Sequence, residues 1–271
     1  MTPDFSTIDV EFNQHIAHLQ LNRPRAANAM NQAMWRELGD AMTWASETPE
    51  VRVVVLSGKG KHFCAGIDLG MLNDLIDDTI TCEGRKREAL RRQILWLQAQ
   101  LSAIAHCRKP VLAAIHGACV GAGVDLISAC DMRYCTDEAM FSIKEIDIGI
   151  VADVGTLQRL PRIIGDGVMR ELTYTGRNFN GVEATTMHLS NAHFPDRDAL
   201  LKHVFEIARE IASKSPLSIR GCKDVMRYSL EHGIEDGLNY VATWNAGMMM
   251  SQDIKIALRA RNKGETPVFE N

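Results

Sequence analysis

The chain contains one local pattern twice, at residues 51–72 and 110–130. In each, an apolar run leads into a glycine-rich turn, and a helix-like segment follows. The runs are Val51–Ser57 and Val111–Ile115. Runs this apolar are typical of strands that are buried on both faces of a sheet. Strands that alternate with helices in this way predict an α/β core.

The hydrophobic periodicity predicts further elements around these two segments. Ile8–Leu21 alternates between apolar and polar residues, which indicates two strands joined by a turn. Asn28–Thr48 and Ala89–His106 carry apolar residues at helical spacing, and Asn28 is a plausible N-cap. Residues 71–92 show little periodicity, so we expect a mobile surface segment there.

The composition of the chain changes near Phe194-Pro195-Asp196. Before this point strands and helices are mixed, and after it residues 200–262 are mostly helical. We therefore expect a core of residues 1–195 that carries the site and a helical region of residues 196–271.

Charge and hydropathy exclude several classes of protein. The 271 residues carry a net charge of −4 with mixed signs, which argues against a nucleic-acid-binding protein. The sequence has no run of 18 apolar residues, so it gives no indication of a membrane-spanning helix. The N-terminal residues do not resemble a secretory or mitochondrial leader, and Val268–Asn271 is not a peroxisomal address. These features predict a cytoplasmic protein that binds neither nucleic acid nor membrane.

Familiar cofactor and nucleophile motifs do not occur. The seven cysteines have no C-x-x-C spacing and the histidines do not cluster with them, so we expect no metal site. Gly117, Gly121 and Gly123 follow a strand, but their spacing differs from the G-x-G-x-x-G of dinucleotide-binding folds. Neither a phosphate-binding P-loop nor a G-x-S-x-G nucleophile motif is present.

Three acids, Asp125, Glu145 and Asp153, lie in a stretch that is otherwise mostly apolar. Burial disfavours the charged form of an acid, so acids in such positions are candidates for proton transfer. Each also has a structural interpretation. Asp125 would interact favourably with the dipole at a helix N-terminus. Glu145 would pair with Lys144 or Arg133, and Asp153 would cap a helix that starts near Val154.

The two glycine-rich turns offer backbone N–H groups that no helix or strand uses. If the turns meet in space, the N–H groups of Ile67 and Ala122 would converge on one oxygen and form an oxyanion hole. Otherwise they are ordinary tight turns between strand and helix.

These residues carry a family resemblance. The segments Phe63–Leu69 and His116–Leu126 resemble the paired signature of the crotonase (enoyl-CoA hydratase/isomerase) superfamily. The similarity runs from Leu21 to the helical tail. The segments around Asp125, Glu145 and Asp153 are most similar to its Δ3,5-Δ2,4-dienoyl-CoA isomerase branch. The resemblance implies a crotonase-like spiral of ββα turns and a C-terminal helical trimerisation region, with trimers that can pair into hexamers.

The resemblance also implies an acyl-CoA site. The thioester oxygen would accept hydrogen bonds from Ile67 and from Ala122, where family members commonly have glycine. No cofactor is implied beyond the CoA of the substrate. The residues implied to line the CoA path are Arg25, Ala27, Ala65, Gly66, Asp68 and Leu69.

The acids imply which reaction takes place. Typical hydratases of the superfamily have glutamates at positions 125 and 145 and glycine at 153, whereas this chain has Asp125 and adds Asp153. A third acid suits the conversion of 3,5-dienoyl-CoA to 2,4-dienoyl-CoA in fatty-acid β-oxidation, because a proton must leave C2 and another must arrive at C6. Glu145 would act at C2, Asp153 at C6, and Asp125 would orient Glu145 or share its proton. The alternatives are a 2-enoyl-CoA hydratase and a non-catalytic acyl-CoA-binding protein.

Overall fold

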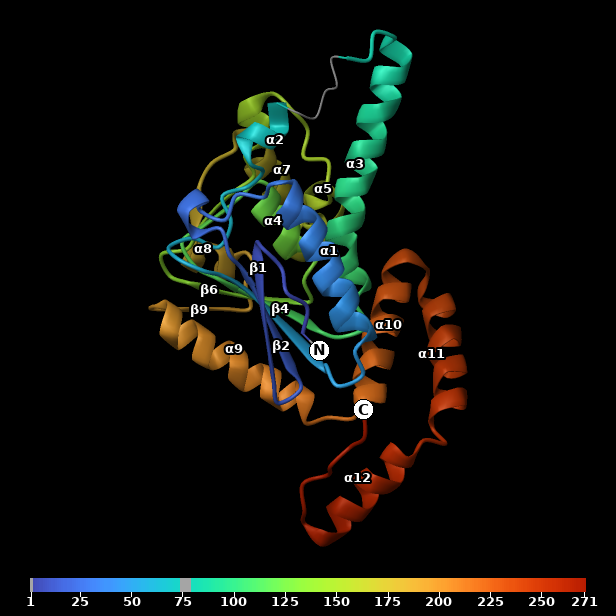
Figure 1. The fold of residues 1–271 in the computed structure, drawn as a ribbon. Helices are drawn as coiled ribbons and strands as arrows, with labels where there is room; N and C mark the ends of the chain where they lie inside the picture. Colours follow the sequence, from blue (N-terminus) through green and yellow to red (C-terminus); the bar gives the residue numbers. More distant parts are fainter. Residues whose placement is uncertain (1, 74–78) are drawn as a thin grey trace.

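The computed structural model describes residues 2–73 and 79–271, and its centre is a six-stranded sheet (Figure 1). The first two strands form an antiparallel hairpin and the others pair in parallel. In their order across the sheet the strands are β1 (Ile8–Asn13), β2 (Ile16–Leu21), β3 (Val53–Gly58), β4 (Val111–Ile115), β6 (Met132–Thr136) and β9 (Ala192–Phe194).

Strand β3 shows why the apolar runs are continuous. Val54 and Leu56 pack into the core on one face of the sheet, and Val53 and Val55 pack into the core on the other. Since successive side chains of a strand point to opposite faces, a sheet covered on both sides needs apolar residues at every position. The prediction of doubly buried strands at β3 and β4 is confirmed.

Helices cover the two faces of this sheet. On one face, α1 (Gln32–Glu47) packs against α3 (Glu83–His106). On the other face, α9 (Arg197–Ala212) presents Leu200, Val204 and Ala208 to the strands. Helix α9 lies beyond the boundary expected at residue 195, yet it packs on the sheet. The division into residues 1–195 and 196–271 therefore stays a prediction.

A smaller three-stranded sheet lies beside the glycine-rich turns. It consists of β5 (Ala118–Val120), β7 (Met140–Ser142) and β8 (Phe179–Asn180), with β7 in the middle. The short helices around it are α2 (Leu69–Asn73), α4 (Ala122–Ser128), α5 (Thr156–Arg159), α6 (Pro161–Ile164), α7 (Asp166–Thr175) and α8 (Gly181–Thr186).

One local prediction is wrong, and a second is right only in part. Asn28 does not cap α1, because the Asn31 side chain accepts the Met34 N–H at 3.0 Å and takes that role. Asn28 is instead buried, and its amide donates to the carbonyls of Lys59 and His62. Of the predicted surface segment, residues 83–92 do lie at the surface and are mostly exposed, but they are helical and belong to α3; residues 74–78 lie outside the described part.

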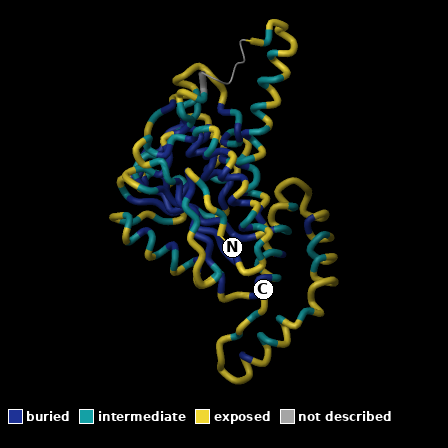
Figure 2. Tube along the Cα trace, viewed as in Figure 1, coloured by how far each residue is buried: buried dark blue, intermediate teal, exposed yellow. Residues whose placement is uncertain are grey.

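The C-terminal helices form an arm beside the core (Figure 1). They are α10 (Pro216–Glu231), α11 (Ile234–Met248) and α12 (Gln252–Lys263). Figure 2 shows that much of α11 and α12 is exposed. The buried Arg52 guanidinium donates to the carbonyls of Ala212 and Phe269, so one side chain holds both ends of the arm. No helix within residues 2–73 or 79–271 is long and apolar enough to cross a membrane.

Candidate active site

The two glycine-rich turns meet in space. The Cys64 N–H donates to the Ala118 carbonyl and the Val120 N–H to the Cys64 carbonyl, each at 2.9 Å. Gly66 has φ of +101°, and a Cβ built on it would lie 3.1 Å from the Val120 oxygen and 3.8 Å from the Ala122 nitrogen. A side chain at position 66 would therefore press on the second turn, so this close approach requires glycine.

Two backbone N–H groups remain free at this junction. The Gly66 carbonyl and the Asp68 N–H both bond to Met30, which leaves the N–H of Ile67 between them unused. Ala122 is the first residue of α4, so its N–H has no partner within the helix. Neither N–H donates to any residue in the described ranges. Ala122 also lies outside the left-handed region, so alanine is accommodated there without strain.

Asp125 lies on α4 and is 1% exposed. Its Oδ1 accepts the N–H of Thr156, the first residue of α5, at 2.7 Å. Its Oδ2 is buried and has no hydrogen-bond partner in the described chain. Burial, and after it the charge of Glu145, raises the pKa of Asp125 from 3.8 to about 7. The acid is thus held at one oxygen and poorly solvated at the other.

Glu145 begins the 3₁₀ turn Glu145–Ile148, three residues after the end of β7 at Ser142, and is half-buried. A Cβ on Gly121 would lie 3.3 Å from Glu145 Oε1, so this carboxylate reaches the second glycine turn. Its Oε2 is buried and lacks a partner among the residues placed. Burial raises the pKa of Glu145, and the charge of Asp153 raises it further.

The expected ion pairs of Glu145 are wrong. Lys144 Nζ turns away to Asp147 Oδ2 at 2.9 Å and to the Gly176 carbonyl at 2.8 Å. The Arg133 guanidinium donates to the carbonyls of Leu189, Ile127 and Cys130. Both cations are used to fix the backbone, which leaves Glu145 without a counter-charge from either.

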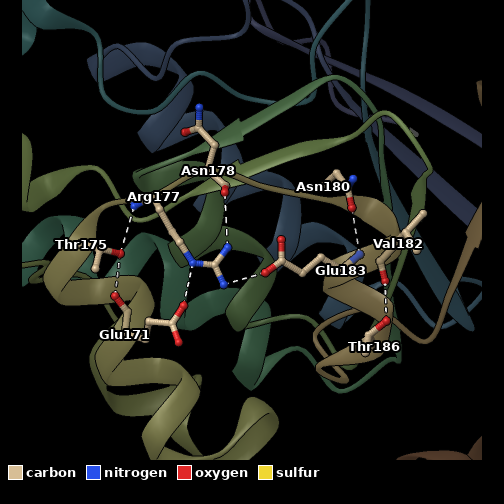
Figure 3. A network of polar contacts seen from close by, with 8 residues as sticks. All are labelled: Glu171, Thr175, Arg177, Asn178, Asn180, Val182, Glu183 and Thr186. Carbon is tan, nitrogen blue, oxygen red and sulfur yellow. Dashed lines mark hydrogen bonds and ion pairs between the residues drawn. The ribbon is translucent and has the colours of Figure 1, made fainter.

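The backbone that leads into Glu145 is anchored to the α7–β8 connection. Ser142 Oγ donates to the Gly176 carbonyl at 2.8 Å. Next to it, Arg177 bridges Glu171 of α7 and Glu183 of α8 at 2.8 and 2.6 Å (Figure 3). This network joins the two helices across β8, which pairs with β7. The backbone before Glu145 is therefore held by residues 26 to 38 positions after Glu145 in the chain.

Asp153 lies between the 3₁₀ turn and α5 and is half-buried. Its backbone carbonyl accepts from Gln98 Nε2 of α3 at 2.6 Å. Asp153 does not cap a helix, because the residue before α5 is Gly155. Burial raises the pKa of Asp153, and its charge also raises the pKa of both Glu145 and Asp125. The three acids therefore lie near enough for their charges to act on one another.

The residues expected along the CoA path differ in their contacts and in their exposure to solvent. The N–H of Ala65 donates to the Ala27 carbonyl at 3.0 Å, which brings these two segments together. Asp68 is held by Arg23 at 2.9 Å, so its carboxylate is already paired. Leu69 is 69% exposed, Arg25 is exposed on the turn Pro24–Ala26, and Gly66 is buried at the junction.

The sequence reasoning missed three supporting residues. Thr156 and Gln98 hold Asp125 and the Asp153 backbone, as described above. Arg159 fills the space that a side chain on Gly155 would need and donates to Ser102 Oγ at 3.1 Å. Their partners lie 31 to 57 residues away, so local pattern offers no signal for these contacts.

Several known proteins are similar to this chain in sequence. The family model described as enoyl-CoA hydratase/isomerase matches residues 11–270. The peroxisomal Δ(3,5)-Δ(2,4)-dienoyl-CoA isomerase of Arabidopsis thaliana is 47% identical over 94% of this chain and 92% of its own length. The mitochondrial enzyme of the same name from Rattus norvegicus is 45% identical over 95% of this chain and 80% of its own.

A solved structure supports the predicted architecture. The enoyl-CoA hydratase of Bacillus anthracis superposes with a TM-score of 0.87 and 31% identity, over 98% of this chain and 99% of that one. The prediction of a crotonase-like α/β fold is confirmed.

The prediction of a cytoplasmic protein is wrong. The relatives above are named as peroxisomal and mitochondrial, and further mitochondrial relatives are 42% identical. The prediction depended on the residues at the two ends of the sequence.

Proposed function

Because the chain belongs to the enoyl-CoA hydratase/isomerase family, we propose that it isomerises 3,5-dienoyl-CoA thioesters to 2,4-dienoyl-CoA in fatty-acid β-oxidation. Its relatives named as dienoyl-CoA isomerases support this reaction. The observation that carries the mechanism is the third carboxylate. Asp153 acts electrostatically on both Glu145 and Asp125, at a site where each acid has a raised pKa.

The first step is the loss of a proton from C2 of the substrate. The thioester oxygen accepts hydrogen bonds from the N–H groups of Ile67 and Ala122, which have no other acceptor in the described residues. Glu145 takes the C2 proton, and the electron pair spreads over the thioester oxygen, C2, C4 and C6. Fixed donors at the oxygen stabilise this dienolate, and one such donor typically contributes roughly 10²–10³ in rate.

The second step returns a proton at C6. Asp153 donates it, the double bonds settle at C2–C3 and C4–C5, and the product is the conjugated 2,4-diene. Glu145 then holds one proton and Asp153 has lost one, so the pair resets when one proton passes back. Raised pKa values suit this exchange, because one of two coupled acids then stays protonated near neutral pH.

Asp125 is a positioning residue in this scheme. Its Oδ1 holds the Thr156 N–H at the start of α5, three residues after Asp153. The negative charges of Asp125 and Glu145 repel each other in a buried space, so the cluster retains a proton. Asp125 therefore links the two acids that contact the substrate.

The CoA path and the assembly belong to the same proposal. Arg25, Ala27, Ala65, Gly66, Asp68 and Leu69 would line the CoA path, with Asp68 acting through its pair with Arg23. The arm would join copies of the chain into a trimer or a dimer of trimers. Its exposed apolar side chains support this, because such surfaces mark contacts. They include Met226, Leu230, Ile234, Leu238 and Leu258. Sedimentation equilibrium gives the mass, and a monomer at micromolar concentration would contradict the assembly.

A direct assay separates the isomerase from a hydratase. The protein is incubated with 3,5-octadienoyl-CoA and, in parallel, with crotonyl-CoA, while ultraviolet absorbance is followed. We expect absorbance of the conjugated 2,4-diene to rise with the first substrate. Brisk hydration of crotonyl-CoA without any rise in diene absorbance would refute the proposal.

A further inference from the structure

Basic side chains gather around a second cavity, away from the three acids. The cavity has a volume of about 300 Å³ and lies between the C-terminal end of α3 and the arm helices α10 and α11. Asp224 is the one acid in its lining, and Trp244 forms part of the wall. The basic side chains that line it are His106, Arg108, Arg220, Lys223 and Arg227.

Ion pairs account for only part of this positive charge. Lys223 Nζ binds Asp131 Oδ2 at 2.7 Å, and Arg227 binds Asp224 Oδ1 at 2.9 Å. Arg108 and Arg220 remain, and neither guanidinium has a hydrogen bond or ion pair with any described residue. Neither guanidinium is therefore hydrogen-bonded or ion-paired among the described residues, although the charge of Asp224 acts on Arg108.

Arg220 is the more constrained of the two. Its Nε is buried from solvent and finds no acceptor in the described parts of the chain. Asp253 is near enough to act on its charge, but Asp253 Oδ2 already accepts from Ser215 Oγ. A buried donor without an acceptor is costly in free energy, so this geometry favours a ligand that supplies one.

The cations also repel one another. Burial and then the charge of Arg108 lower the pKa of Arg220. Neighbouring Lys109 has its pKa lowered to about 8, by burial first and then by Arg220 and Arg108. An anion placed among these groups would relieve the repulsion.

We propose that this cavity binds a small phosphate-bearing anion through Arg108 and Arg220. A guanidinium presents paired N–H donors that match phosphate oxygens, and a phosphate monoester carries about −1.5 to −2 charges at neutral pH, so it would attract both arginines. The Trp244 indole packs over Gly221, where a Cβ would lie 2.4 Å from Nε1. Its ring provides a flat wall for the organic part of such a ligand.

The site is separate from the proposed catalytic acids. Gln98, which contacts the Asp153 backbone, precedes His106 by two turns of α3, or about 12 Å at 1.5 Å per residue. Binding here is therefore tested independently of the isomerase reaction.

The experiment uses the whole chain, with inorganic phosphate and AMP as probes at constant ionic strength. Trp244 fluorescence and calorimetry report binding, and Trp244→Phe identifies the fluorescence signal. We expect saturable binding of phosphate that Arg220→Gln and Arg108→Gln each weaken by about tenfold or more, since charge-assisted hydrogen bonds are the strong ones. Arg36→Gln, an exposed arginine on α1, is the matched control and should bind as the unaltered chain does.

The two probes identify the source of the phosphate group. Tighter binding of AMP than of phosphate indicates an organic phosphate whose ring meets Trp244, and equal binding indicates the free ion. Absence of saturable binding by the unaltered chain overturns the proposal, as does equal affinity in Arg220→Gln. If phosphate does not bind and Arg220→Gln lowers the assembled mass, the cavity is a contact between subunits and the proposal is wrong.

Discussion

Replacing Asp125 by Asn tests whether this carboxyl is buried with a raised pKa. Asn keeps an oxygen that can accept the Thr156 N–H, so the contact with α5 survives. It removes the charge and places an NH2 donor where the buried Oδ2 has no hydrogen-bond partner in the described chain. The folded pKa of Asp125 is about 7, against 3.8 for an ordinary aspartate. Between these values the folded chain binds more protons than the unfolded chain, so stability from this group is full at low pH and is lost as pH rises through about 7.

The magnitude follows from the shift of about three pKa units. Each unit corresponds to about 1.36 kcal/mol, so the raised pKa costs roughly 4 kcal/mol at pH 8, where Asp125 is ionised in the folded chain. At about pH 5 it costs roughly 2 kcal/mol, because Asp125 must bind a proton on folding. The advantage of Asp125→Asn over the unaltered chain should therefore grow by roughly 2–3 kcal/mol across this range. Because Asp125 and Glu145 interact, the rise in pKa belongs to both acids, and the two titrate as a pair.

Urea unfolding at both pH values, followed by circular dichroism, measures this difference. Protein concentration is held fixed, because assembly would add to the apparent stability. Asp147→Asn is the control, since Asp147 is exposed and pairs with Lys144; its effect should stay within about 1 kcal/mol at either pH. If the advantage of Asp125→Asn does not grow with pH, the carboxyl is not held in a poorly solvated place and the reasoning fails.

Three further predictions concern catalysis, packing and the arm. The pH profile of kcat/KM on the dienoyl substrate should be bell-shaped, because Glu145 must be ionised and Asp153 protonated. The pKa values that define its two limbs should both lie above those of ordinary carboxyl groups. A flat profile would contradict these roles. Gly123→Ala should destabilise the fold by about 1–3 kcal/mol in urea unfolding, since its Cβ would lie 2.8 Å from the Cys64 carbonyl oxygen. Gly84→Ala is its control, because nothing lies within 4 Å there and alanine favours helix. Arg52→Met should free the tail, and limited proteolysis should then remove C-terminal residues faster than in the unaltered chain.

The sequence predicts the parts of this fold whose physical cause is local. The Val111–Ile115 run is apolar at every position because both faces of its sheet are covered, and that requirement is visible in the residues themselves. The glycine turns are equally visible, because the close approach at Gly66 excludes a side chain. Residues 83–92 gave no such signal. Figure 1 shows the start of α3 projecting beyond the core, where solvent surrounds it and no apolar stripe is needed.

The rest depends on contacts between distant segments. Asn28 is of a residue type that often caps helices, yet its side-chain amide donates to backbone carbonyls more than 30 residues away. Glu145 has two cations near it in sequence, and both bind backbone carbonyls instead. Local pattern identified the three acids as unusual, and only the fold brings them near one another, with Thr156 on Asp125 and Gln98 on the Asp153 backbone.

The most direct test of the account is turnover of 3,5-octadienoyl-CoA by Asp153→Asn. Loss of one general acid–base group typically costs about 10²–10⁴ in rate, so formation of the 2,4-diene should fall by that factor. Binding of a non-reacting acyl-CoA should be unchanged, and Asp147→Asn should turn over normally, since Asp147 is paired with Lys144 outside the cluster. Diene formation by Asp153→Asn at the rate of the unaltered chain would contradict a proton transfer that needs the third acid.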